Sequence, residues 1–350
     1  MLRALLYIPW KLWTLFPDFV RRRTYLFIAR RWGISQSLCT VTRLPLGLAL
    51  KRTYDRSPDI EASSMRFVRR NTTIPVADVF DVVPPNGKEG GLLLTSWIEG
   101  QSLGSWIHSH SIWPPGFQKN LDILMHSDSI DEREAALARM ETMEPKIDVS
   151  DDHPLLVDLR NALAQLRSLP SPSCGPQICN VHGGPTIWAR CRDRRLLQPV
   201  NTVAEFHELL FEEVSWTTRL ERLRLIAQPV HSKDHRITFT HSDMNASNIL
   251  VKDDHLVAII DWEFAGWYPE YWEYTQLIMQ NLHLRPREEF WRRVGFFSGQ
   301  YDDELKLERA LWHSTGDMSI APGVIPDDPL DLEVAQEVRG KIERSLKIQG

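Results

Sequence analysis

Residues 237–263 contain the densest group of side chains able to do chemistry. Asp243 and Asn248 follow one apolar run, and Asp261 follows a second. Two short apolar runs joined by the polar turn 252–255 predict a β-hairpin. Asn248 would begin its first strand and Asp261 would end its second. We therefore expect these two side chains to lie side by side, with Asp243 on the loop that leads to the same edge.

Three oxygen-bearing side chains at one end of a hairpin suit Mg²⁺, a hard ion that binds one or two carboxylates together with water and phosphate oxygens. Asp243 would remain able to accept a proton. A hydroxyl group that attacks the terminal phosphate of ATP needs such a carboxylate near its proton and cations near the phosphate oxygens. The alternative is that the three residues are ordinary turn formers at a hairpin edge.

Lys51 and Glu61 are candidates for a second part of the same site. A strand predicted over residues 42–51 places leucines on one face and ends at Lys51. A helix predicted from Ser57 to about Asn71 carries Glu61 on the side of its apolar residues, where a carboxylate needs a cation. Otherwise Lys51 is a surface residue at a strand end, and Glu61 serves only the helix dipole.

The order of these motifs resembles a known family. His241 to Asn248 forms the string H-x-D-x(4)-N, and Asp261-Trp262-Glu263 stands where protein kinases carry Asp-Phe-Gly. Ala49-Leu50-Lys51 takes the place of the kinase lysine strand. Over about residues 40–110 and 155–315 the chain is similar to aminoglycoside phosphotransferases and choline kinases, and most closely to their fungal branch.

The resemblance implies ATP and Mg²⁺ as cofactors and a role for each residue. Asp243 would be the catalytic base, on a loop braced by His241, and Asn248 and Asp261 would hold Mg²⁺. The nucleotide would be bound by Lys51 through its phosphates, by the ion-pair partner Glu61, and by backbone groups of Ser96 and Ile98 at the adenine.

The resemblance also implies an α+β fold that is bilobal and protein-kinase-like. A small sheet-and-helix N-lobe would span residues 36–95, a connector 96–100 and a mainly helical C-lobe 101–350, with an insertion at about 111–152. The sequence before Lys51 lacks a glycine-rich loop with its preceding hairpin, so we expect a short or missing lid over the phosphates. No Ala-Pro-Glu motif follows the hairpin, which disfavours protein substrates.

The expected acceptor is a small molecule with a hydroxyl group, and the acidic body of the chain favours a cationic one. Glutamates and tryptophans after the hairpin are candidates for its pocket. We expect the tryptophans instead to be core, and the carboxylates other than Glu263 and Glu270 to be solvated. The residues concerned are Glu263, Trp267, Glu270, Trp272 and Glu273. The rival hypothesis is a pseudokinase-like module that binds nucleotide without transferring phosphate.

Charge is unevenly distributed along the chain. The 350 residues are 43% hydrophobic with a formal net charge of −5, an ordinary globular composition. Residues 1–35 carry seven basic residues and one Asp, a net charge of +6, which leaves −11 for the rest. An acidic body disfavours nucleic-acid binding.

The basic leader, residues 1–35, carries apolar residues at helical spacing. These residues are Leu5, Ile8, Leu12, Leu15, Phe16 and Phe19. We expect a helix that packs this apolar stripe on the body. The alternative is an interfacial helix held on anionic lipid by Trp10, Trp13 and the arginines.

Four cysteines in a chain of 350 residues are too few for a disulfide framework and favour a reducing compartment. Their spacing with His182 matches no common zinc site, and we expect ordinary thiols at Cys174, Cys179 and Cys191. No run reaches the roughly 18 apolar residues of a membrane span. The start of the chain lacks a signal-peptide cleavage site. We therefore expect a cytoplasmic protein.

Overall fold

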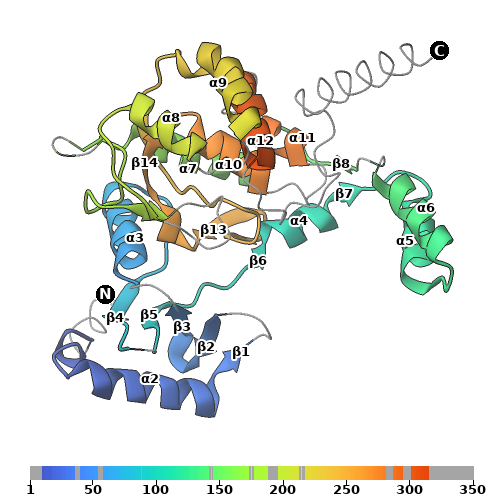
Figure 1. Ribbon diagram of the computed structural model, residues 1–350. Coiled ribbons are helices and arrows are strands. Elements are labelled where there is room, and N and C mark those ends of the chain that lie inside the picture. Colours follow the sequence, from blue (N-terminus) through green and yellow to red (C-terminus); the bar gives the residue numbers. More distant parts are fainter. Residues whose placement is uncertain are drawn as a thin grey trace, which may run out of the picture. The chain divides into compact units, whose positions relative to one another are not determined.

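The computed structural model covers the chain in several segments (Figure 1). The structure describes residues 10–35, 40–53, 58–87, 89–141, 143, 145–172, 175, 177–187, 196–212, 214, 217–280, 287–294 and 301–314. Some predicted features lie outside these residues, namely Leu5 and Ile8 of the leader, the helix start at Ser57, and Cys174 and Cys191.

The chain forms two compact units, and each is described here by itself. The first unit comprises residues 1–168, 243–263 and 280–296. The second comprises residues 169–242, 264–279 and 297–350. The boundaries expected from the sequence at residues 36, 96 and 101 stay predictions.

A five-stranded antiparallel sheet lies in the first unit. Its strands in spatial order are β1 (Ile34–Ser35), β2 (Val41–Leu44), β3 (Leu48–Thr53), β5 (Gly91–Ser96) and β4 (Val79–Val83). Leucine and valine side chains from the sheet form one core cluster with Tyr25 and Ala29 of a preceding helix. This sheet carries Lys51, which lies opposite Leu93 of β5.

The segment predicted as one strand over residues 42–51 is two strands. The chain reverses at Pro45–Gly47, where Leu46 has a φ of 64° and an exposed side chain. The sequence pattern did not indicate this turn, because leucines continue to occupy every second position across it. β1 also pairs with β2, so the hairpin that the sequence appeared to lack is present before Lys51. The sequence between the two strands, residues 36–40, contains no glycine, and residues 36–39 lie outside the described residues.

Helix α2 (Asp18–Trp32) packs on the sheet, as expected for the leader, but the side that meets the sheet is not the predicted apolar stripe. Its buried side chains are Arg21, Arg22, Tyr25 and Ala29. The described part of the predicted apolar stripe is exposed instead, at Leu12, Leu15, Phe16 and Phe19. The stripe prediction is therefore wrong, because buried arginines find partners in the sheet: Arg21 pairs with Asp81, and Arg22 donates to the carbonyl oxygens of Gly90 and Pro84.

Helix α3 (Asp59–Asn71) follows β3 and carries Glu61 on its buried side with Met65 and Val68, as predicted. After the connector come β6 (Gln101–Ser102) and α4 (Leu103–Ser109). Ser102 caps α4, because its hydroxyl accepts a hydrogen bond from the Ser105 amide at 3.2 Å.

The predicted hairpin is present as β12 (Ile249–Lys252) and β13 (His255–Ile259). β6 pairs with the other edge of β12. α7 (Pro154–Ser168) contacts β13, where Asp158 accepts the Leu256 amide at 3.1 Å, and α11 (Arg287–Val294) contacts α7. These elements support the hairpin that carries the candidate catalytic residues.

The insertion at about 111–152 is a helical hairpin. α5 (Phe117–His126) and α6 (Ile130–Glu141) contact each other, with a hydrogen bond of 2.9 Å from Arg139 to Asn120. β7 (Ser111–Ile112) pairs with β8 (Lys146–Ile147) at its base. The insertion expected from the sequence is thus built mainly of two helices.

The second unit is mainly helical. Its elements are β9 (Thr186–Ile187), β10 (Leu196–Leu197), α8 (Val203–Phe211), α9 (Thr217–His231), β11 (Ile237–Thr240), β14 (Gly266–Pro269), α10 (Trp272–Gln280) and α12 (Asp302–Ser314). β11 pairs with β14, and β9 pairs with β10. Cys179 is buried, and neither it nor His182 belongs to a group of potential metal ligands within the described residues.

The fold is therefore α+β and protein-kinase-like, as predicted. Along the chain, a small antiparallel sheet comes first, and the helix-rich sequence that follows it includes the β12–β13 hairpin. None of the described helices is long and apolar enough to cross a membrane.

Candidate active site

Lys51 lies between two carboxylates from distant parts of the chain. Its Nζ atom is 2.8 Å from Glu61 Oε2 and 2.6 Å from Asp261 Oδ1. Burial alone would lower the pKa of Lys51, but the charges of Glu61 and Asp261 raise it above its usual value. The lysine thus stays charged. The predicted Lys51–Glu61 pair is confirmed, and Asp261 joins it.

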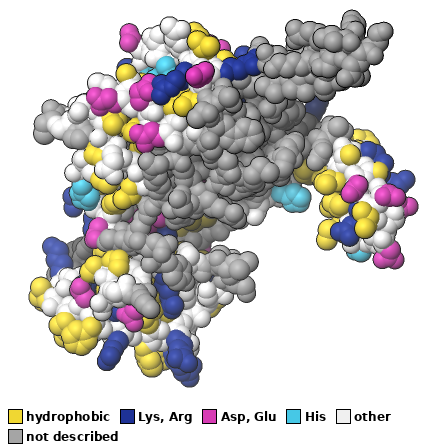
Figure 2. Space-filling view, viewed as in Figure 1, with side chains coloured by type: hydrophobic (Ala, Val, Ile, Leu, Met, Phe, Trp, Pro, Cys, Tyr) yellow, Lys and Arg dark blue, Asp and Glu magenta, His cyan; other side chains and the backbone are white. Residues whose placement is uncertain are grey.

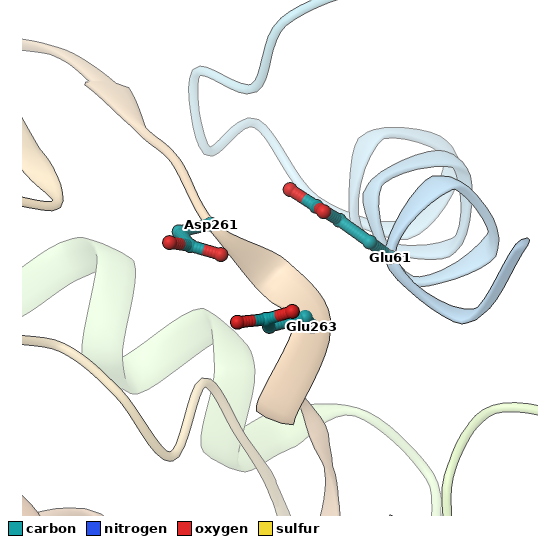
Figure 3. Close-up of side chains that lie close together, drawn as sticks. All are labelled: Glu61, Asp261 and Glu263. Carbon is teal, nitrogen blue, oxygen red and sulfur yellow. The ribbon is translucent and has the colours of Figure 1, made fainter. Parts of the chain in front are cut away.

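A third carboxylate, Glu263, comes to the same point. Oxygens of Glu61, Asp261 and Glu263 lie within 4.8 Å of one another. Figure 3 shows Glu61 reaching from α3 towards the segment after β13 that carries the other two. The pKa of Glu61 is raised to about 7, chiefly by burial; the charge of Lys51 opposes this rise, and the neighbouring carboxylates add to it. Three carboxylates around one ammonium group thus form a site that a second cation would stabilise.

The donor set at this point fits Mg²⁺. Asp261 and Glu263 offer carboxylate oxygens. Asn248 directly precedes β12, the strand that pairs with β13. Hard oxygen ligands of this kind are the ones that Mg²⁺ prefers. The sequence assigned Asn248 and Asp261 to the metal, whereas the structure adds Glu263, which the sequence had placed with the acceptor.

The backbone turns sharply at Asp261. The Ile260 amide donates to the Asn248 carbonyl at 2.9 Å, so the hairpin ladder extends to the end of β13 and keeps the two strand ends adjacent, as predicted. Asp261 then adopts a φ of 66°, and Ser242, at the entrance to the loop, has a φ of 64°. Non-glycine residues rarely adopt this conformation, and where they do they cluster at functional sites.

Asp243 is held by amide groups of its own loop. Asn248 Nδ2 donates to the Asp243 carbonyl at 2.9 Å and to Oδ2 at 3.1 Å, and Asn245 Nδ2 donates to Oδ1 at 3.2 Å. The pKa of Asp243 is raised to about 7. Burial is the main cause and the Asp261 carboxylate adds to it, while the hydrogen bonds from the two amides act in the opposite direction. A carboxylate with a pKa near neutrality is well placed to accept a proton. Because the Asn248 nitrogen is used here, its Oδ1 is the atom left for a metal ion.

The sequence of the hairpin region matches a family model. The model described as "Phosphotransferase enzyme family" matches residues 130–307, half of the chain, and this range includes Asp243, Asn248 and Asp261. The chain belongs to the phosphotransferase enzyme family. Lys51 and Glu61 lie before the matched range, so their assignment depends on the geometry described above.

Comparison with other proteins gives weaker likenesses. No curated protein matches the sequence at a significant level. ADP-bound aminoglycoside phosphotransferase APH(2'')-Ib is 14% identical with a TM-score of 0.49, covering 89% of this chain and 95% of that one. The apo form of a thermostable mutant of aminoglycoside phosphotransferase APH(4)-Ia is 12% identical with a TM-score of 0.49, covering 82% and 87%. The gentamicin complex of APH(2")-IIa is 13% identical with a TM-score of 0.45, covering 82% and 84%.

In the second unit of this phosphotransferase, Glu273 holds the strand end that leads into the catalytic loop. Its Oε2 accepts the His241 amide at 2.5 Å and the Ser242 amide at 3.4 Å. Trp272 Nε1 donates to the Ser242 hydroxyl at 2.9 Å. His241 itself is fully buried. The backbone at His241 is therefore held by a glutamate that the sequence reasoning did not assign. That the His241 side chain braces the loop stays a prediction.

The glutamates and tryptophans proposed for an acceptor pocket have structural partners. Trp267 and Trp272 are buried, as expected for core residues. Glu273 is only 2% exposed, so the expectation of a solvated carboxylate is wrong, because two backbone amides bind it. Glu270 accepts a hydrogen bond from Arg236 Nε at 3.1 Å. In the sequence, the one sign that Glu273 is buried is its position within the aromatic stretch 271–274.

The phosphotransferase connector carries Ser96 and Ile98, whose backbone groups were expected to bind adenine. The Ser96 amide donates to the Asp78 carbonyl at 2.9 Å, so this amide is used within the sheet. Ile98 follows the end of β5, and its amide has no hydrogen-bond partner among the described residues. The Ile98 amide is therefore available to a base, and at Ser96 the carbonyl would have to serve. Adenine binding by both residues stays a prediction.

Proposed function

We propose that the protein transfers the γ-phosphate of ATP, in the presence of Mg²⁺, to a hydroxyl group of a small molecule. Membership of the phosphotransferase family supports transfer of a phosphoryl group. The observation that carries the proposal is the position of Lys51, which joins Glu61 of α3 to Asp261 at the hairpin edge. A lysine held by carboxylates in this way is suited to bind phosphates.

Each group at the site has a part in this reaction. Lys51 would bind phosphate oxygens, while Asp261, Glu263 and Asn248 Oδ1 would hold Mg²⁺. When bound, Mg²⁺ neutralises the charge that develops on the transferred phosphoryl group. Asp243 would accept the proton of the acceptor hydroxyl as its oxygen bonds to the γ-phosphorus and ADP leaves. Its pKa of about 7 suits this transfer near neutral pH.

The acceptor proposed is small and preferably cationic. The chain outside residues 1–35 carries a net charge of −11, so the field around the site favours a positively charged molecule. The absence of an Ala-Pro-Glu motif after the hairpin argues against protein acceptors.

A second candidate function is nucleotide binding without transfer. The sequence between β1 and β2, residues 36–40, contains no glycine, although glycines let a backbone approach phosphates closely. The intact set of Lys51, Glu61, Asp243, Asn248 and Asp261 favours the enzyme, because a binding module has no chemical need for Asp243.

Thermal unfolding with ATP and Mg²⁺ tests the nucleotide site. Ligand at about 100 times its Kd stabilises the native state by about 2.7 kcal/mol, so the Tm should rise by several degrees and fall back when EDTA is added. Asp261→Asn should abolish this rise. Asp253→Asn is the matched control, because Asp253 lies exposed in the turn of the same hairpin, with a φ of 50° that asparagine tolerates. An unchanged Tm in the wild-type protein would exclude both candidate functions.

A further inference from the structure

The inner face of α2 is built from charged and polar side chains. Arg21 pairs with Asp81, and Tyr25 Oη donates to the second oxygen of the same carboxylate at 2.6 Å. Arg22 Nη1 donates to the Gly90 carbonyl at 2.6 Å. These contacts fix which side of the helix meets the sheet. The opposite side of α2 therefore faces away from the sheet, and it carries exposed apolar side chains.

The outer face of α2 and the turn before it expose apolar side chains. Phe19, Arg23 and Phe27 recur every four residues and so share one face. The apolar side chains more than half exposed are Leu12, Leu15, Phe16, Phe19, Phe27, Trp32 and Ile34. Figure 2 shows hydrophobic and Lys or Arg side chains interleaved in the part of the view where Figure 1 places α2. So many exposed apolar side chains on one surface mark an interaction site. We call this surface the α2 outer face.

The α2 outer face is also basic. Lys11, Arg23, Arg30 and Arg31 are exposed, and none has an ion-pair partner among the described residues. Arg31 lies over the Trp32 ring, 5.6 Å from its centroid. The acidic residue of this helix, Asp18, pairs with the buried Arg21. The face thus presents four positive charges among aromatic and aliphatic side chains.

A cavity beside the same turn adds more positive charge. It has a volume of about 470 Å³, and its lining includes Lys11 and Thr14 together with Arg66 and Arg70 of α3. In the described part of the chain no carboxylate pairs with Arg66 or Arg70. Unpaired cations around a hollow favour an anionic group such as a phosphate.

We propose that the α2 outer face binds the anionic surface of a phospholipid membrane. Aromatic and aliphatic side chains interleaved with arginines are typical of helices that lie in the membrane interface. Anionic headgroups would pair the arginines while the apolar side chains enter the acyl boundary. A second copy of the chain would instead place like charges opposite one another. The cytoplasmic leaflet is rich in anionic lipid, which fits the cytoplasmic location expected from the sequence.

Flotation of the full chain with vesicles tests this proposal. The protein should float with vesicles of phosphatidylcholine containing about one third phosphatidylserine, and not with phosphatidylcholine alone. Raising the salt from about 0.1 M to about 0.5 M should weaken the binding several-fold, because salt screens the charges.

Two double variants separate the apolar contribution from the charge. Phe19→Ser/Phe27→Ser and Arg23→Glu/Arg30→Glu should each lower vesicle binding at least about fivefold. Met125→Ser/Ile130→Ser is the matched control, because both residues are about equally exposed on α5 and α6. All three variants change exposed side chains, so circular dichroism and the Tm should match the wild-type values.

Several results would overturn the proposal. These are absence of flotation, equal binding to neutral vesicles, and unchanged binding in both α2 variants. Light scattering that shows a wild-type dimer lost in both α2 variants would assign the face to self-association. The face would be assigned to an acidic protein partner if the chain bound polyglutamate as strongly as vesicles. In that case the arginine variant would lose this binding and the phenylalanine variant would keep it.

Discussion

Lys51 Nζ and Asp261 Oδ1 lie 2.6 Å apart although 210 residues separate them in the chain. This contact fastens the sheet strand β3 to the end of the hairpin that carries Asp243. A phosphate group that binds Lys51 would therefore lie next to the proposed metal ligands. This ion pair joins the two proposed parts of the site, which makes it the most informative place for mutation.

Replacing Lys51 should destabilise the protein more at high pH than at low pH. Lys51→Met leaves Glu61 and Asp261 without a cation, and the pKa of Glu61 is already about 7. Without Lys51 the pKa of Glu61 rises further, because the ammonium charge no longer lowers it, so neutralising Glu61 with a proton costs more free energy at pH 8 than at pH 6. We expect a loss of about 2 kcal/mol at pH 8 and clearly less at pH 6, measured by urea unfolding.

The double variant Lys51→Met/Glu61→Gln provides the control for this measurement. Removing the carboxylate should recover part of the lost stability, and the recovery should be larger at pH 8. Equal losses at both pH values in the single variant would contradict a coupled Lys51–Glu61 pair.

Asp243→Asn should abolish transfer without weakening nucleotide binding. A positioned base contributes about 10²- to 10⁴-fold to such a step, so kcat for phosphate transfer or slow ATP hydrolysis should fall by that range. The Tm rise with ATP and Mg²⁺ should remain. Asp253→Asn, the same chemical change in the exposed hairpin turn, should keep full activity. Equal rates in Asp243→Asn and wild type would leave nucleotide binding as the function.

Acid should destabilise the second unit through His207. This side chain is 3% exposed, its Nε2 lies 3.0 Å from Tyr271 Oη, and burial lowers its pKa to about 3, with the charges of His231 and His235 adding to the effect. The unfolded chain binds this proton near pH 6.5, so stability is present above that pH and is lost as the pH falls towards 3.

His207→Gln should remove this pH dependence. From pH 6.5 to pH 5 the wild-type protein should lose about 2 kcal/mol more than the variant, measured by urea unfolding at each pH. His108→Gln, at an exposed histidine of α4, should follow the wild-type curve. Parallel curves for wild type and His207→Gln would show that His207 does not stay neutral in the fold.

Asp81→Asn should release α2 from the sheet. The change leaves the guanidinium of Arg21 buried without its main partner, and Asp81 is only 3% exposed, so we expect a loss of about 3 kcal/mol. Asp18→Asn removes the exposed partner of the same arginine and should cost less than about 1 kcal/mol. Hydrogen exchange of the amides in residues 18–32 is the direct measurement, and similar protection in both variants would contradict the buried pair.

The sequence predicted the features that depend on local pattern. The hairpin, the adjacency of Asn248 and Asp261, and the position of Glu61 on the buried side of α3 follow from residue periodicity and spacing. The order of the motifs led to the family, which the match over residues 130–307 confirms. That the fungal branch is the nearest one stays a prediction.

The features that depend on distant partners were not predictable. Arg21 and Arg22 are buried because Asp81 and two carbonyl oxygens more than 50 residues away receive them. The turn at Pro45–Gly47 was hidden by leucines that alternate across it. Glu273 looked like a solvated carboxylate until its partners, the amides of His241 and Ser242, were located.

The helical hairpin of α5 and α6 leaves and re-enters the fold at almost the same point. The Asp148 amide donates to the His110 carbonyl at 3.3 Å, so the chain ends on either side of the hairpin meet directly. A short bridge could replace the whole segment with little change in loop-closure entropy. Replacing α5 and α6 by such a bridge should therefore leave the length and register of the β12–β13 hairpin unchanged.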